Sequence, residues 1–113
     1  MLTGPIVGTD VYNQAIKEFK EGNADSAIEK MRSINSASPV FKSSLEALSK
    51  FYYQREMYSE LFGLATFYRI RFKNHADIDL SVLTLEILSL GKLCQFDSAD
   101  KLLSQLKESY SLE

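Results

Sequence analysis

The chain has 113 residues, of which 45% are apolar and 12% aromatic, with 13 basic and 15 acidic side chains. A chain of this length buries about two-thirds of its surface on folding, so its core needs neither a metal nor disulfides. The single cysteine, Cys94, and the single histidine, His75, exclude an internal disulfide framework and a Cys/His zinc site. The formal net charge of −2 argues against a general polyanion binder.

The sequence contains no recognisable targeting segment. The first ten residues have no basic start and no apolar run long enough for a secretory signal. The most apolar stretch, residues 80–94, is interrupted by Glu86 and Lys92 and is too short to cross a bilayer. We therefore expect a cytoplasmic protein with no membrane span.

The first predicted hairpin consists of two apolar runs with helical spacing. Apolar residues recur at three- and four-residue steps over residues 11–19 and again over residues 24–34. Between these runs, Gly22 can adopt the left-handed backbone that ends a helix, and Asn23 can cap the next helix. A loop over residues 35–39, closed by a proline, follows the hairpin.

The second predicted hairpin has apolar steps over residues 41–52 and 58–68, with a turn at residues 55–57. Residues 68–73 alternate apolar and basic side chains, which is a strand pattern. No second strand-like run is present to pair with them, so we interpret this stretch as a helix end that frays near Lys73.

The third predicted hairpin follows a polar loop at residues 74–76, after which Asp77 or Asp79 can cap a helix. Its apolar residues recur at helical spacing over residues 83–94 and 96–106. Six helices arranged in three pairs predict an all-α fold.

An internal repeat is the strongest feature of the sequence. The string Asp25-Ser26-Ala27 recurs as Asp97-Ser98-Ala99, at the same distance behind a predicted turn. The distance along the chain between these two strings corresponds to two repeat units of about 36 residues each. The second hairpin is the unit between the first and the third.

The spacing of small and large apolar residues resembles the tetratricopeptide repeat, whose unit has about 34 residues. Two residues depart from that pattern, because Leu61 stands where a small residue is usual and Glu86 where leucine is expected. The residues that fit are Val11, Ala15, Gly22, Ala27, Met31, Pro39, Leu45, Leu48, Ser49, Tyr52, Tyr58, Leu83, Leu90, Phe96, Ala99 and Leu103.

The resemblance implies three stacked antiparallel helix-turn-helix units that form a right-handed α-solenoid of about six helices. These units are expected at about residues 8–41, 42–75 and 78–110. We expect one such domain over residues 10–113, preceded by a non-helical lead-in over residues 1–9 that contains two glycines and a proline.

In tetratricopeptide repeats the first helix of each unit lines a concave groove, which the resemblance places on this chain. The expected groove residues are Tyr12, Ile16, Phe19, Lys20, Glu46, Lys50, Tyr53, Thr84, Leu88 and Lys92. Tyr12 and Ile16 occupy places where carboxylate-gripping members of the family carry a polar clamp, so that role is disfavoured. An aromatic and aliphatic groove with a few lysines suits an apolar helical or extended peptide. We therefore expect a non-catalytic interaction module, or adaptor, with a protein or peptide partner.

Three other roles stay open at this stage. Small three-repeat proteins of this kind resemble type III secretion chaperones, which hold an amphipathic helix of a secreted subunit. The chain could also form a homo-oligomer through a C-terminal end that carries Leu102, Leu106 and Leu112.

The third is RNA binding, because the first hairpin also resembles the pentatricopeptide repeat. Asn13 would stand at a base-reading place, but the matching residue of the third unit, Leu85, cannot read a base. Only the middle unit is basic, through Arg69, Arg71 and Lys73, so nucleic-acid binding is disfavoured.

The residues that could carry catalysis or hold a cofactor are few. We interpret His75 as an exposed turn residue and Cys94 as a buried core thiol, because Cys94 continues an apolar helical register. Asp97 and Asp100 flank a helix start, where they act as caps and dipole partners. The sequence therefore predicts no enzyme, no metal site and no cofactor.

Overall fold

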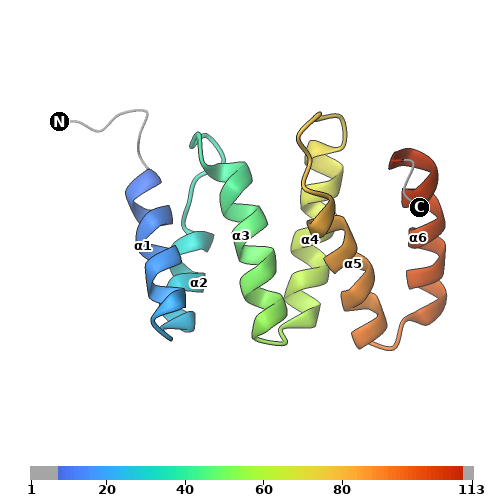
Figure 1. Ribbon diagram of the computed structural model, residues 1–113, viewed down its shortest axis with the longest axis horizontal. Coiled ribbons are helices and arrows are strands. Elements are labelled where there is room, and N and C mark those ends of the chain that lie inside the picture. Colours follow the sequence, from blue (N-terminus) through green and yellow to red (C-terminus); the bar gives the residue numbers. More distant parts are fainter. Residues whose placement is uncertain (1–7, 111–113) are drawn as a thin grey trace. The chain divides into compact units, whose positions relative to one another are not determined.

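The computed structural model describes residues 8–110, and this part of the chain is all-α, with no strand. The helices lie where the apolar periodicity predicts them, and they follow one another along the chain in the order that Figure 1 labels. Their bounds are α1 (Thr9–Lys20), α2 (Ala24–Arg32), α3 (Phe41–Gln54), α4 (Tyr58–Phe72), α5 (Leu80–Lys92) and α6 (Phe96–Tyr110).

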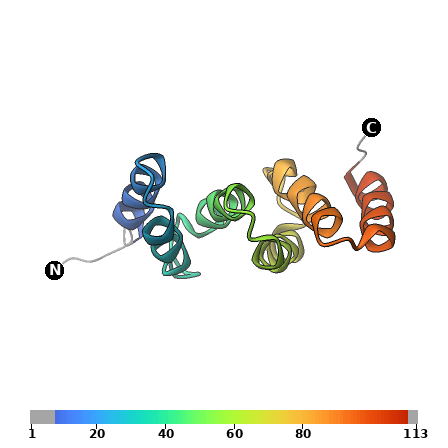
Figure 2. The same ribbon diagram turned by 90° about the horizontal axis from the view of Figure 1, so that it is seen from below.

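The chain divides into two compact units at the turn between α3 and α4, after Arg55. In the first unit α1 packs against α2, α2 packs against α3, and α1 also touches α3. In the second unit α5 packs against both α4 and α6, and Figure 2 shows it between these two helices. Each unit is thus a small three-helix assembly in which helices adjacent in sequence are adjacent in space.

The same left-handed turn recurs in the chain before α2, α4 and α6. Gly22, Glu56 and Cys94 have φ angles of 94°, 60° and 62°. At Gly22 and Cys94 the turn is a Schellman motif, in which the following amide donates to the carbonyl five residues earlier, at 2.8 Å in both cases. This shared geometry explains why the sequence repeats in register around these positions.

The structure corrects the prediction for Cys94, which is exposed rather than buried. Helix α5 ends at Lys92, so the helical register that placed Cys94 in the core no longer applies two residues later. Cys94 occupies the left-handed position where Gly22 stands in the first hairpin. His75 is exposed, as predicted.

We expect Cys94→Gly to stabilise the protein by about 0.5–1 kcal/mol and Gly22→Ala to destabilise it by about 1 kcal/mol. A side chain strains left-handed backbone, and a Cβ at Gly22 would meet no atom within 4 Å, so only the backbone cost would be measured. Urea unfolding of both variants measures the two changes in stability. Equal destabilisation by both changes would contradict it.

Helix α5 begins directly after Asp79, one of the two residues predicted to cap it. The Asp79 side chain accepts hydrogen bonds from the backbone N–H and the hydroxyl of Ser81, at 2.9 and 2.6 Å. The Asp79 backbone N–H donates to the Tyr68 hydroxyl at 2.8 Å, which ties the start of α5 to α4. Tyr68 and Phe72 are both buried, one helical turn apart, so residues 68–72 are helical and the strand pattern there is misleading.

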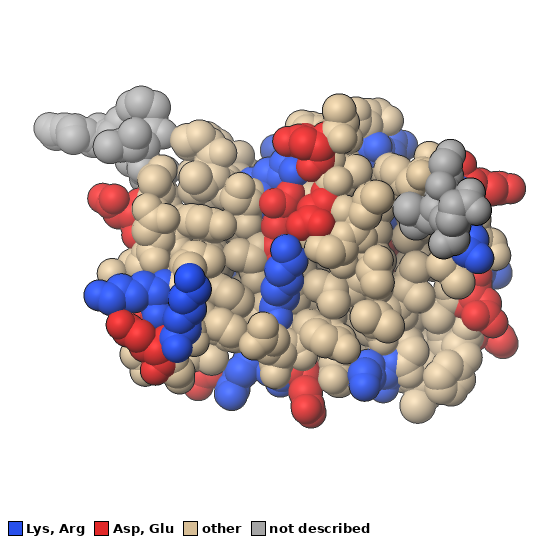
Figure 3. All heavy atoms as spheres, viewed as in Figure 1, with Lys and Arg blue, Asp and Glu red and all other residues tan. Residues whose placement is uncertain are grey.

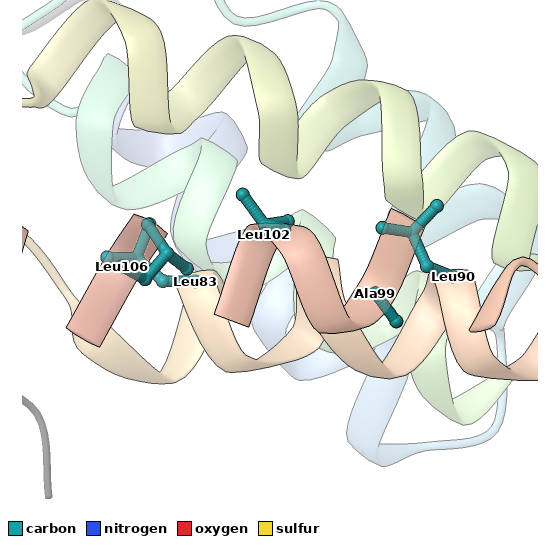
Figure 4. Packing of buried hydrophobic residues seen from close by; sticks show 5 residues of the cluster. All are labelled: Leu83, Leu90, Ala99, Leu102 and Leu106. Carbon is teal, nitrogen blue, oxygen red and sulfur yellow. The ribbon is translucent and has the colours of Figure 1, made fainter. Parts of the chain in front are cut away.

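The core of the second unit lies between α5 and α6. Leu83 and Leu90 of α5 pack with Ala99, Leu102 and Leu106 of α6 (Figure 4). Leu102 and Leu106 are only 7% and 3% exposed, which corrects the prediction that they leave an apolar C-terminal surface for self-association. The third residue of that prediction, Leu112, lies outside the described residues.

Glu18 holds α1 against α2 in the first unit. Its carboxylate accepts hydrogen bonds from the Ser26 hydroxyl at 2.6 Å and from the Gln14 amide at 3.0 Å, and it pairs with Lys30 at 3.1 Å. The bond from Ser26, followed by those from Gln14 and Lys30, lowers the pKa of Glu18 from 4.5 to about 2.

We expect the Glu18→Gln variant to be less stable than the natural chain at neutral pH, with the difference shrinking in acid. Because folding lowers the pKa of Glu18, its contribution is complete above about pH 4.5 and is lost as the pH falls toward 2. Urea midpoints measured between about pH 7 and pH 3 test this. Glu29→Gln, at an exposed carboxylate of α2, is the control for the loss of one negative charge and should cost less stability than Glu18→Gln at neutral pH.

Candidate functional site

Four of the predicted groove residues lie together in the first unit. Tyr12 and Ile16 of α1 face Glu46 and Lys50 of α3 across a depression of about 280 Å³. The remaining lining residues are Ser43, Ala47 and Phe51. We call this depression the α1/α3 groove.

A pair of aromatic rings joins the two walls of the α1/α3 groove. The rings of Phe19 and Phe51 are stacked, with centroids 3.9 Å apart and planes 3° from parallel. Phe51 is 7% exposed and borders the groove, so the stack forms part of its base. Stacked aromatic rings contribute about 0.5–1.5 kcal/mol beyond their buried area, which helps to fix the distance between α1 and α3.

The charged side chains of this groove belong to α3. The Lys42 ammonium lies 2.6 Å from the Glu46 carboxylate, one helical turn away, and both side chains are 20% exposed. Acidic and basic atoms lie together in a column over α3, with uncharged surface toward α1 (Figure 3). The groove therefore has an apolar wall from α1 and a charged wall from α3.

The other predicted groove residues lie elsewhere. Lys20 is exposed near the end of α1, and Tyr53 is half-buried on α3, and neither borders the α1/α3 groove. Thr84, Leu88 and Lys92 lie on α5, in the second unit, where their four-residue spacing places them on one exposed face.

The second unit contains a buried ion pair that sequence reasoning did not identify. The Glu86 side chain is 1% exposed, and its carboxylate accepts bonds from Arg69 Nε at 2.8 Å and Nη2 at 3.0 Å. The Thr66 hydroxyl donates to the same carboxylate at 2.7 Å. These bonds to Glu86 raise the pKa of Arg69 above its ordinary value. The only signal in the sequence was an acidic residue inside the apolar stretch 80–94.

This ion pair changes how the basic run at the end of α4 is interpreted. Arg69 is committed to Glu86, and its side chain is only 25% exposed. Arg71 and Lys73 are exposed, and the Arg71 guanidinium lies 5.7 Å from the centroid of the Phe72 ring. An RNA-binding role would therefore depend on Arg71 and Lys73 rather than on the whole run.

A larger hollow lies between α4 and α6, with α5 beneath it. One part, of about 420 Å³, is bordered by Phe62, Thr66 and Arg69 of α4 and by residues of α5 and α6. A second part, of about 530 Å³, is bordered by Arg69, Lys73 and residues of the C-terminal half of α6. Arg69 and Gln105 border both parts, so the two parts adjoin, and together we call them the α4/α6 trough.

Within residues 8–110 there is no group of three or more His, Cys, Asp or Glu side chains placed to hold a metal ion. In the same part of the chain, every helix is too short or too polar to cross a membrane. Comparison of the chain with protein-family models, with curated proteins and with solved structures found no match.

Proposed function

We propose that the protein is a non-catalytic interaction module that binds an apolar peptide segment of a partner protein in the α1/α3 groove. The observation that carries this proposal is the shared depression between Tyr12 and Ile16 on one helix and Glu46 and Lys50 on the next. The resemblance to tetratricopeptide repeats implies that these residues stand at positions which that family uses for binding.

The dimensions and chemistry of the groove favour a side chain rather than a small metabolite. A volume of about 280 Å³ is at or below the lower end of small-molecule pockets, which hold about 300–1,000 Å³, but it accommodates one or two apolar side chains. Ile16 and Phe51 supply apolar contact, while Lys50 and Glu46 can bond to the peptide backbone or to flanking polar groups. A segment presenting spaced apolar side chains matches this arrangement.

The test is a selection of random dodecapeptides displayed on phage, performed on the natural chain. Peptides that bind the α1/α3 groove should lose at least about tenfold in affinity on Ile16→Asp, because the new carboxylate would be desolvated in the groove. Asn13→Asp adds the same charge to an exposed position of α1 and is the control. Circular dichroism verifies that both variants are folded.

Two results would overturn the proposal. One is a selection that yields no peptide whose binding depends on Ile16, and the other is an equal loss on Ile16→Asp and Asn13→Asp. Lys50→Glu provides a second variant at the opposite wall, and it should change the charge preference of the selected peptides without abolishing their binding.

A further inference from the structure

We propose that the α4/α6 trough is a second and independent binding site, which takes a short acidic segment of a partner protein containing one large apolar side chain. The apolar side chain enters the end of the trough near Phe62, and carboxylates beside it are held by Arg69 and Lys101. This site differs from the α1/α3 groove in its helices, its charge and the ligand it selects.

The shape of the trough suits an extended peptide. It runs along α4 from Phe62 to Lys73, which at 1.5 Å per helical residue is about 16 Å. An extended chain covers that length with about five residues at 3.3 Å each. At the far end the Tyr110 hydroxyl donates to the Lys73 carbonyl at 3.3 Å, which links α6 to the end of α4.

One end of the trough is apolar. Phe62 of α4, Leu90 of α5 and Leu102 of α6 line it together with Leu93 of the following turn. Leu90 and Leu102 are 6% and 7% exposed, while Phe62 and Leu93 are half-buried. A leucine or phenylalanine side chain placed there removes apolar surface from water on both partners, at about 25 cal/mol per Å².

The middle of the trough carries uncompensated positive charge. Arg69 binds Glu86 through Nε and Nη2, and among the described residues its Nη1 has no hydrogen-bond partner. Lys73 and Lys101 also border the trough, and neither is in an ion pair within residues 8–110. Because Arg69 and Glu86 neutralise each other, Lys73 and Lys101 face only Glu108 among the other charged lining residues, and the remaining excess of positive charge favours an acidic ligand.

The buried pair holds Arg69 in place before any ligand arrives. A buried ion pair seldom stabilises a fold more than well-packed apolar residues do, so its presence beside a cavity calls for another reason. With Nε and Nη2 fixed by Glu86, the guanidinium presents Nη1 at the junction of the two parts of the trough without further loss of side-chain freedom. A carboxylate can then bond to a preorganised Arg69.

The experiment uses the same displayed dodecapeptides, sorted by the variants that abolish their binding. Ser98→Tyr fills the trough from α6, and Lys101→Glu reverses the charge of its rim. Peptides specific for the trough should lose at least about tenfold in affinity on either change, and should be enriched in Asp and Glu around Leu or Phe. Their binding should also weaken with added salt.

Two matched controls lie on the same helix. Ser104→Tyr and Lys107→Glu make the same changes at exposed α6 positions that do not border the trough, and both should leave binding unchanged. Ile16→Asp should also leave it unchanged, which separates failure of this site from failure of the α1/α3 groove.

Three outcomes would overturn the inference. One is that no selected peptide loses affinity on Ser98→Tyr and Lys101→Glu. Another is that the peptides that do lose affinity are not enriched in Asp and Glu. The third is that a single-stranded oligouridylate binds with the same dependence on Ser98 and Lys101 while no peptide does, because the trough would then be a nucleic-acid site.

Discussion

Replacing Arg69 with methionine should lower the free energy of unfolding by about 3–5 kcal/mol, one of the largest effects we expect for a single substitution. The change would leave the Glu86 carboxylate, 1% exposed, with Thr66 as its one remaining hydrogen-bond donor among the described residues. A buried carboxylate without its countercharge must either stay charged at high cost or take up a proton. Urea unfolding at neutral pH measures the loss.

A double-variant cycle separates the ion pair from simple packing. Arg69→Met combined with Glu86→Leu should recover most of the lost stability, because two apolar side chains then replace the pair. Lys73→Met removes an exposed cation just beyond the same helix and should cost less than about 0.5 kcal/mol. If Arg69→Met alone were as mild as Lys73→Met, the buried pair would have no role in holding α4 to α5.

The same double variant keeps the fold but removes the guanidinium from the α4/α6 trough. Peptides that lose affinity on Ser98→Tyr should therefore bind the double variant more weakly than the natural chain, even though the stability of the double variant is restored. This separation of stability from binding distinguishes a positioned cation from a purely structural one.

The helices and their turns could be predicted from the sequence because their causes are local. Apolar spacing, a glycine at position 22 and a capping aspartate at position 79 each act within a few residues. Cys94 was predicted wrongly because its apolar character continued a register that the backbone abandons after Lys92. Only the spacing shared with Gly22 could have revealed its left-handed conformation.

The α4/α6 trough could not be predicted because its parts are joined only by packing. Glu86 was visible as a charge in an apolar stretch, but its partner Arg69 lies 17 residues earlier on another helix. The strict alternation around Arg69 resembled a strand, and it gave no sign of which helix face would be buried. The tetratricopeptide resemblance implies binding residues on the first helix of each predicted hairpin, and α4 and α6 are second helices in that scheme.

The second large effect is expected at Leu83, which is fully buried in the core of the second unit. Leu83→Ala should lower the free energy of unfolding by about 2–5 kcal/mol, because it removes buried methyl groups and leaves a cavity. Leu80→Ala, on the same helix, truncates a side chain that is 41% exposed and should cost less than about 1 kcal/mol. Denaturant unfolding of the two variants compares them directly, and equal losses would contradict the packing between α5 and α6.

The Leu83→Ala variant also tests whether the core between α5 and α6 positions the α6 wall of the α4/α6 trough. Helix α6 packs against α5 through Leu83 and its neighbours, so loosening this core should let the α6 wall of the trough move. Leu83→Ala should therefore weaken the peptides that depend on Ser98 and Lys101, and it should spare those that depend on Ile16, because Ile16 belongs to the other unit. Hydrogen exchange should show the lost protection in α5 and α6 and unchanged protection in α1 and α2. If both peptide classes weakened equally, the two sites would not be independent.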